Sequence, residues 1–168
     1  MTQQQRTRGG TCSYARVSYF AYGSNLDERQ MRARCPSAGA PVRATLDHHV
    51  LVFGGRSSTW GGAVANIVPA RGAQVEGLIY QIDREDVLVL DQYEGHPIMY
   101  ERAQRLVVDA AKRRRRVAVY VLRDRAFRIG APPARYFDVL ARAYVRYGFD
   151  LQPLLAAARA GQPGRHRI

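Results

Sequence analysis

The chain has 168 residues, of which 46% are hydrophobic, and its 26 lysine and arginine residues outnumber 14 aspartate and glutamate residues, giving a formal net charge of +12. This length and composition favour one globular domain over two small ones, and the charge favours acidic partners. No apolar run approaches the roughly 20 residues of a membrane span, and the polar start lacks the apolar core of a signal peptide, so we expect a cytoplasmic protein with no membrane partner.

The ends of the chain are predicted to lie outside the fold. Residues 1–15 are polar, contain glycine and show no periodicity, which is typical of a flexible tail. A single domain is expected over residues 16–160, followed by a frayed tail over 161–168. Cys12 and Cys35 have no second cysteine or nearby histidine at a metal-ligand spacing. We therefore expect buried or idle thiols and no metal site.

The domain is predicted to begin with an aromatic-rich strand that stops on a Gly-Ser-Asn turn, in residues 19–26 (YFAYGSNL). Such a turn can aim bare backbone amides at a bound ligand, because glycine permits a tight backbone and a close approach. Taken alone, the turn is also explained as a strand end that caps the next helix. That helix is expected over residues 27–34, with Asn25 or Asp27 as its N-cap and Pro36 beyond its end.

The middle of the chain is rich in predicted strands. Strands are expected over 43–53, 63–69 and 75–82, with a loop over 54–62 around Trp60. Residues 83–93 carry apolar side chains at helical spacing, so a helix capped by Asp83 is expected to deliver Glu94 at its end, where Gly95 stops it. Helices are also expected over 134–147 and 151–160. Together these elements predict an α+β domain whose sheet curls into a barrel.

A basic run from Lys112 to Arg116 separates two alternating stretches, 105–108 and 117–122, that are typical of a hairpin. This places the run on the hairpin tip. A solvated tip is the simpler interpretation, and contact with a polyanion is the alternative. Zinc-finger spacing and aromatic RNA-binding motifs are both lacking, so nucleic acid is not the favoured partner.

Several spaced blocks resemble the γ-glutamylcyclotransferase-like family, which includes AIG2-like proteins and γ-glutamylamine cyclotransferases. The resemblance covers roughly residues 17–155. It rests on residues 19–26, 60–69 (WGGAVANIVP), 75–80 (VEGLIY) and 90–95 (LDQYEG), followed by Tyr100.

The resemblance implies a small mixed β-barrel with flanking helices, a glycine-serine turn that binds substrate through backbone amides, and a catalytic glutamate. It also implies that the Pro-x-x-Tyr segment at the end of residues 132–136 (PPARY) supplies a tyrosine to the pocket. We therefore take Glu94 as the catalytic residue. The substrate-binding residues are predicted to be Tyr22, Gly23, Ser24, Asn25, Leu26, Tyr100 and Tyr136.

The chemistry implied by the family is physically consistent with these residues. A γ-glutamyl amide carries its own nucleophile, the α-amine, so ring closure to 5-oxoproline is intramolecular and needs no enzyme nucleophile or cofactor. One carboxylate can serve as base and then as acid, provided that desolvation raises the pKa of Glu94 above its ordinary value of about 4.3. The expected substrate is a small γ-glutamyl amide, with an anionic or carrier-bound form left open, as is the oligomeric state. The alternative is a noncatalytic module of the same fold that holds a polyanion through its arginine-rich surface.

Six other residues have competing interpretations. Glu76 also precedes a glycine, but it sits in a strand pattern and is expected to face outward. Asp91 either shares a helix face with Glu94 or pairs with an arginine. Trp60 either packs in the core or lines a pocket mouth, and His96 either tunes Glu94 or occupies a surface turn. Without the family, Tyr100 and Tyr136 would be core aromatics.

Overall fold

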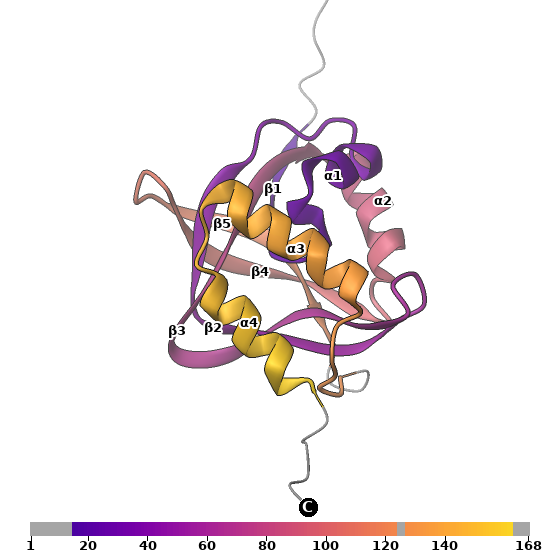
Figure 1. Ribbon diagram of the computed structural model, residues 1–168. Coiled ribbons are helices and arrows are strands. Elements are labelled where there is room, and N and C mark those ends of the chain that lie inside the picture. The colour runs from indigo at the N-terminus through magenta and orange to yellow at the C-terminus, as the bar shows by residue number, and fades with distance from the viewer. Residues whose placement is uncertain (1–14, 124–126, 163–168) are drawn as a thin grey trace, which may run out of the picture.

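The computed structural model describes residues 15–123 and 127–162, which form a closed five-stranded barrel with helices packed outside it (Figure 1). Antiparallel pairing links neighbouring strands, except that β1 and β5 run parallel and close the barrel where Tyr19 lies opposite Ala118. This arrangement confirms the predicted α+β class and the small mixed barrel. In order around the barrel, the strands are β1 (Arg16–Ala21), β3 (Gly62–Asp83), β2 (Val42–Ser57), β4 (Tyr100–Asp109) and β5 (Arg114–Leu122).

The long β2–β3 hairpin differs from the sequence prediction. Two strands were expected over 63–69 and 75–82, but β3 is continuous, and β2 extends four residues into the expected loop, to Ser57. The register shifts between Asp47 and His49, where the single residue His48 of β2 lies opposite residues 70–73 of β3, and His48 has a positive φ of 57°. A β-bulge of this kind bends the strand and increases its twist. The bulge therefore lets one long strand continue through residues 70–74, which the sequence prediction left between two strands.

The helices lie close to their predicted positions: α1 (Glu28–Arg34), α2 (Arg84–Glu94), α3 (Ala134–Tyr147) and α4 (Leu151–Ala160), with a short 3-10 helix, η1 (Ser24–Leu26), before α1. Asp27 caps α1 by accepting a hydrogen bond from the Gln30 amide at 3.0 Å. Asp83 holds the N-cap position of α2, although its side chain makes no capping bond. None of the described helices is long and apolar enough to span a membrane.

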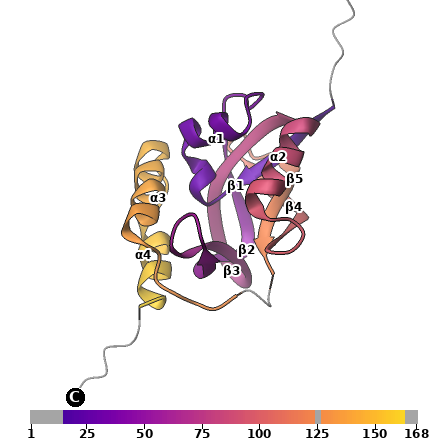
Figure 2. The ribbon, with the colours of Figure 1, turned by 90° about the vertical axis from the view of Figure 1, so that its right-hand side faces the viewer.

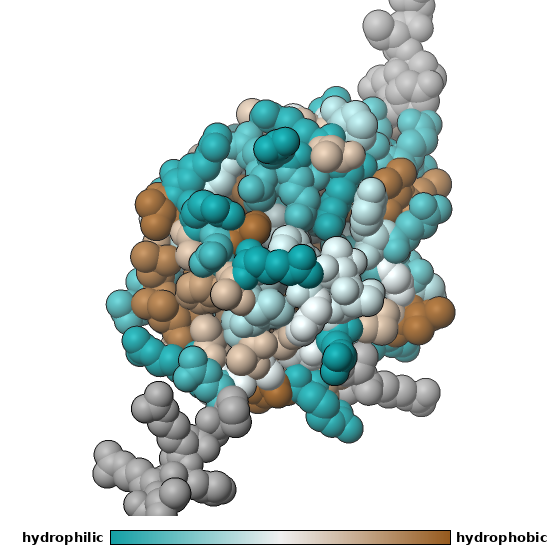
Figure 3. All heavy atoms as spheres, turned by 45° about the vertical axis from the view of Figure 1, so that its right-hand side comes forward, coloured by the Kyte–Doolittle hydropathy of each residue, from teal (hydrophilic) through white to brown (hydrophobic). Residues whose placement is uncertain are grey.

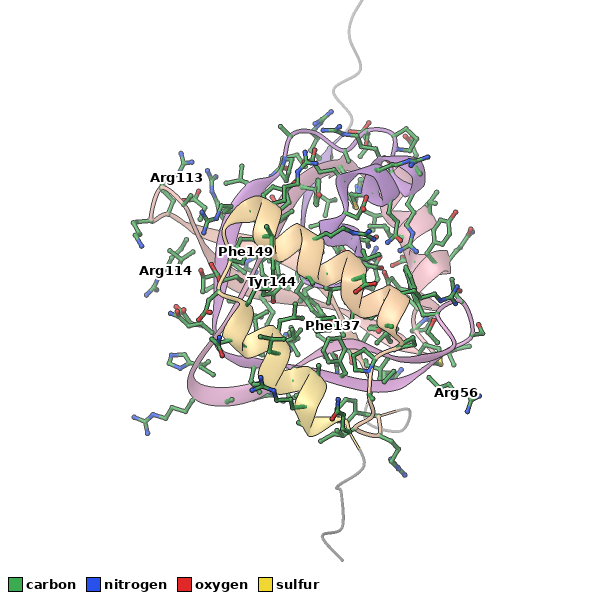
Figure 4. All side chains as sticks on the ribbon, viewed as in Figure 1. Arg56, Arg113, Arg114, Phe137, Tyr144 and Phe149 are labelled. Atoms are coloured by element: carbon green, nitrogen blue, oxygen red, sulfur yellow. The ribbon has the colours of Figure 1, made fainter. Side chains whose placement is uncertain are left out.

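The helices cover two sides of the barrel. Figure 2 shows α3 and α4 on one side and α2 on the other. The buried residues of α3 are Tyr136, Leu140, Ala143 and Tyr144, which recur at helical spacing and face the barrel. Tyr144 packs edge-on against Phe149, with ring centroids 5.4 Å apart, and both lie near the C-terminal end of α3 (Figure 4). This packing fixes the rotation of α3 and directs Tyr136 at its first turn toward the barrel.

The predicted ends of the domain are only partly described. Residues 1–14 of the predicted N-terminal tail and residues 163–168 of the predicted C-terminal tail lie outside the described residues. The first strand begins at Arg16 and the last helix ends at Ala160. The single domain expected over residues 16–160 stays a prediction.

The basic hairpin differs from the prediction, because Arg114 and its next two neighbours belong to β5 rather than to the tip. The side chain of Asp109 is 1% exposed and accepts bonds from Nε of both Arg113 and Arg115, each at 3.0 Å. It also accepts from the backbone amides of Ala111 and Arg113 at 2.9 Å. Arg113 and Arg114 lie at the outer end of the hairpin (Figure 4). Arg113 and Arg115 therefore supply hydrogen bonds to one buried carboxylate, that of Asp109.

We expect Asp109→Asn to lower the melting temperature, most strongly near neutral pH. The backbone N–H of Arg113, together with the guanidinium groups, lowers the pKa of Asp109 to about 2. Because the folded pKa lies below the unfolded value, the stabilisation is fully present above about pH 4 and is lost as the pH falls toward 2. The melting temperatures of the unaltered chain and of Asp109→Asn are measured by circular dichroism at several pH values between 2 and 7. Asp47→Asn, at a half-buried carboxylate that accepts from Gln74, is the control. A pH-independent difference in melting temperature for Asp109→Asn would contradict the prediction.

Candidate active site

A cavity of about 40 Å³ opens where the end of β1 meets α2 and α3. Every residue predicted for the site lines it except Leu26, which is 1% exposed and packs in the core. Three further lining residues, Tyr19, Ala65 and Tyr120, were not predicted. The full lining is Tyr19, Tyr22, Gly23, Ser24, Asn25, Ala65, Glu94, Tyr100, Tyr120 and Tyr136.

The turn after β1 forms one wall of the cavity. Gly23 is the N-cap of η1, so Ser24 and Asn25 begin a helix whose first N–H groups have no intrahelical acceptor. A Cβ atom on residue 23 would lie 3.1 Å from the hydroxyl of Tyr136 and 3.5 Å from the Cβ of Ala65. Glycine therefore leaves room for the close approach of Tyr136 to the backbone, and a side chain here would crowd the tyrosine hydroxyl. The turn can present amide donors beside a phenol.

Glu94 is the last residue of α2, and Gly95, with φ of 63°, ends the helix in the left-handed conformation. One carboxylate oxygen of Glu94 lies 3.5 Å from Nδ2 of Asn25 and 4.0 Å from Nη1 of Arg34. Burial raises the pKa of Glu94 to about 7, and the Arg34 charge and the Asn25 hydrogen bond oppose part of that rise. This direction agrees with the sequence prediction. At neutral pH both protonation states are populated, as an acid-base group requires.

Tyrosine hydroxyls surround the carboxylate. Tyr136 accepts a hydrogen bond from the Ala65 amide at 3.1 Å, and Tyr100 donates to the Ala65 carbonyl at 3.3 Å. The Tyr22 hydroxyl donates to the Tyr120 carbonyl at 2.5 Å, so Tyr22 contributes its ring to the wall while its hydroxyl is engaged. Burial raises the pKa of the Tyr22, Tyr100 and Tyr136 hydroxyls well above the ordinary range. They remain protonated, and Tyr136 keeps its own proton to donate.

A second layer of polar contacts lies behind the cavity on the α2 side. The hydroxyl of Tyr120 donates to Asp91 at 2.6 Å, and Arg102 donates to the other oxygen of Asp91 at 3.0 Å. Asp91 therefore pairs with an arginine, which was one of its two predicted roles. Sequence reasoning missed Tyr120 because it lies on β5, and its position at the cavity depends on barrel closure with β1 rather than on any local motif.

The remaining candidates lie around the site rather than in it. Trp60 packs edge-on against Tyr136, with ring centroids 4.9 Å apart, and so supports the cavity wall from behind. The His96 ring accepts from the Arg102 amide at 3.2 Å, which ties down the turn after α2. Glu76 faces outward as predicted and accepts from the Asp150 amide at 2.7 Å.

Only one of the two cysteines, Cys35, lies in the described part of the chain. Cys35 is buried, its thiol lies 3.7 Å from the Asp86 carbonyl, and burial raises its pKa to about 12. The thiol is therefore protonated and a poor nucleophile. Cys12 lies outside the described residues. Within the described part of the chain, no three histidine, cysteine, aspartate or glutamate side chains gather in a metal-binding group.

Comparison with known proteins gives a consistent family. The model of the family "Gamma-glutamyl cyclotransferase, AIG2-like" matches residues 19–136. Human γ-glutamylcyclotransferase is 37% identical over 81 residues, which are 46% of this chain and 43% of the human protein. The bovine protein of the same name matches equally well over the same length. The chain thus aligns with less than half the length of these curated relatives.

Solved structures show the same fold over nearly the whole chain. A structure described as a γ-glutamyl cyclotransferase matches with a TM-score of 0.78 and 24% identity, covering 92% of each chain. A human protein described as uncharacterized matches with a TM-score of 0.77 and 25% identity, covering 91% of this chain and 92% of the other. The family match includes both the turn after β1 and the helix end that carries Glu94. The chain belongs to the γ-glutamyl cyclotransferase, AIG2-like family.

Proposed function

We propose that this protein converts a γ-glutamyl amide into 5-oxoproline and a free amine, with Glu94 as the acid-base residue and no cofactor. The observation that carries the proposal is a buried carboxylate, with a pKa of about 7, in the same small cavity as the Gly23–Ser24 turn. A binding site has no need of a proton carrier at that position. The family membership supports the reaction class.

The reaction begins with proton removal. Glu94 takes a proton from the substrate α-ammonium, and the free amine attacks the γ-carbonyl carbon to form a five-membered ring. Because nucleophile and carbonyl belong to one molecule, the step gains the large effective molarity of intramolecular attack. The carbonyl oxygen becomes an oxyanion, which the backbone amides of Gly23 and Ser24 and the hydroxyl of Tyr136 can stabilise.

The second stage expels the amine. Glu94 passes protons from the ring nitrogen to the leaving nitrogen as the original amide C–N bond breaks. The α-nitrogen loses two protons in total, the leaving group departs as an ammonium, and Glu94 returns to its carboxylate form. No water is consumed, so exclusion of solvent by the surrounding tyrosines favours cyclisation over hydrolysis.

The size of the cavity bears on the substrate. Because the cavity is only about 40 Å³, the leaving amine is proposed to extend through its opening. The whole chain carries a formal net charge of +12. Figure 3 shows a mostly hydrophilic face with hydrophobic groups near its edges. The net positive charge of the chain would attract an anionic or carrier-bound substrate by long-range electrostatics.

The pH dependence of kcat/KM follows from the acid-base assignment. Glu94 must be ionised to take the first proton. We therefore expect kcat/KM to rise with pH through a midpoint near 7, matching the Glu94 pKa of about 7, and to level off above it. Rates from pH 5 to pH 8 in a constant-ionic-strength buffer measure this. A midpoint near the ordinary glutamate value of about 4.3 would contradict it.

A substrate panel tests the reaction itself. The purified protein is incubated with γ-glutamyl amino acids and γ-glutamyl amines, and 5-oxoproline is quantified by mass spectrometry. Release from at least one compound supports the proposal, and the rates rank the leaving amines. Release from none, together with salt-sensitive binding of a polyanion that Glu94→Gln leaves unchanged, would favour the noncatalytic module instead.

A further inference from the structure

Arg34, at the end of α1, lies beside the candidate catalytic carboxylate, although it is not part of the cavity wall. Its side chain is 15% exposed, and its Nη1 atom lies 2.9 Å from Oδ1 of Asn25 and 4.0 Å from Oε1 of Glu94. The guanidinium also lies over the ring of Tyr93, 4.7 Å from its centroid. A charge this sheltered is costly unless it is partnered. Its partners are the residues that hold the active-site carboxylate.

The first effect of Arg34 is on the orientation of Asn25, which is 3% exposed. Its Oδ1 atom accepts from Arg34 and from Nε2 of Gln30 at 3.2 Å. Two donors on the oxygen leave the Nδ2 atom to face the hydroxyl of Tyr19 at 2.9 Å and Glu94 at 3.5 Å. The amide group can therefore donate toward the carboxylate in only one of its two flipped forms.

The second effect is electrostatic. The tyrosines on which the Glu94 charge acts, from β1, the turn after it, β4 and α3, are Tyr19, Tyr22, Tyr100 and Tyr136, and burial keeps them neutral. On α2 itself, Asp91 is paired with Arg102. Within the described residues, the cation paired with Glu94 is Arg34, which lowers the pKa that burial raises. Removing the Arg34 charge would therefore allow desolvation to raise the pKa of Glu94 further.

We propose that Arg34 is a positioning residue of this site, which fixes the Asn25 amide and holds the Glu94 carboxylate in its ionised, oriented form. The proposal rests on the function proposed above, in which Glu94 must begin as a base. Arg34 has no direct contact with substrate in this scheme. It acts through the two residues that do.

The test compares Arg34→Met, which removes the charge, with Arg34→Lys, which keeps the charge but lacks the planar fork that reaches two partners. Gln30→Met removes the second donor to Asn25 without a change of charge. Arg32→Met, at a neighbouring arginine that is 54% exposed and paired with Glu28, is the matched control. For each chain, kcat and KM are measured against pH, and the Glu94 carboxyl is titrated directly by carbon-13 NMR.

We expect Arg34→Met to raise the Glu94 titration midpoint and to lower kcat by roughly 10- to 100-fold, as a misplaced catalytic group does. Arg34→Lys should keep the midpoint near that of the unaltered chain and recover part of kcat. Gln30→Met should lower kcat without raising the midpoint, and Arg32→Met should change neither. If Arg34→Met does not fold, Arg34→Lys and Gln30→Met carry the test.

An unchanged midpoint and unchanged kcat in Arg34→Met would overturn the proposal. The proposed function fails separately, through absence of 5-oxoproline release from the unaltered chain. In that case the NMR titration still decides the role of Arg34, because it needs no substrate. A raised midpoint supports the coupling to Glu94, and an unchanged one removes it.

Discussion

Replacing Glu94 with glutamine is expected to lower the rate of 5-oxoproline release by at least about 100-fold, the usual contribution of a general base. Glutamine has nearly the same shape and can still contact Asn25, but its amide cannot accept the proton that the α-ammonium must lose. Because the side chain is retained in size, substrate binding should change much less than turnover. Steady-state kinetics on the best compound of the γ-glutamyl panel measure kcat and KM separately.

The control for this substitution comes from the same helix. Glu85→Gln removes an exposed carboxylate from the first turn of α2 and should leave kcat unchanged. Thermal unfolding of both variants shows whether the fold is intact. Because Glu94 is largely buried and its pKa is about 7, the neutral glutamine is not expected to destabilise the protein. Equal 5-oxoproline release by Glu94→Gln and the unaltered chain would remove the proposed role of this residue.

The parts of the site that the sequence predicted are those encoded locally. Residues 19–26 contain both the strand and the turn that ends it, so the amide donors could be placed from one stretch of sequence. Glu94 could be placed at a helix end because apolar spacing marked the helix and Gly95 marked its stop. Asp27 was recognisable as a cap because it precedes the helix and its side chain can accept a bond from the Gln30 amide.

The parts that the sequence did not predict depend on contacts between distant strands. Ala65 supplies both its amide and its carbonyl to cavity tyrosines, but this position follows from the register of β3 in the closed barrel. Arg34 was recognisable as a helix residue but not as a partner of Glu94, 60 positions away. The role of Asp109 could not be predicted for the same reason. Its burial and its pairing with Arg113 and Arg115 leave no periodic pattern in the sequence. Burial and partner choice are set by tertiary packing.

Gly77 is a residue at which we expect a small substitution to reduce the stability of the fold strongly. It lies on β3 opposite Ala44, next to the strand pair that positions the turn after β1. A Cβ atom on residue 77 would lie 2.5 Å from the Cζ atom of Phe20 and closer still to the carbonyl oxygen of Ala21. Phe20 is fully buried, so neither neighbour can move without disturbing the core. Gly77→Ala is therefore expected to cost roughly 1–3 kcal/mol, the usual penalty of overpacking.

A loss of that size should lower the melting temperature by roughly 2–12 °C for a chain of this length, which circular dichroism can follow. Gly39→Ala is the matched control, because a Cβ atom there would lie 3.9 Å or more from the nearest group and should leave the melting temperature nearly unchanged. Equal melting temperatures for the two variants would show that the strand has room at residue 77. Since Phe20 and Ala21 directly precede Tyr22 and Gly23, a shift of β1 would also displace the amide donors. Gly77→Ala should therefore lose turnover even at temperatures where it remains folded, which links the packing of the barrel to the geometry of the proposed active site.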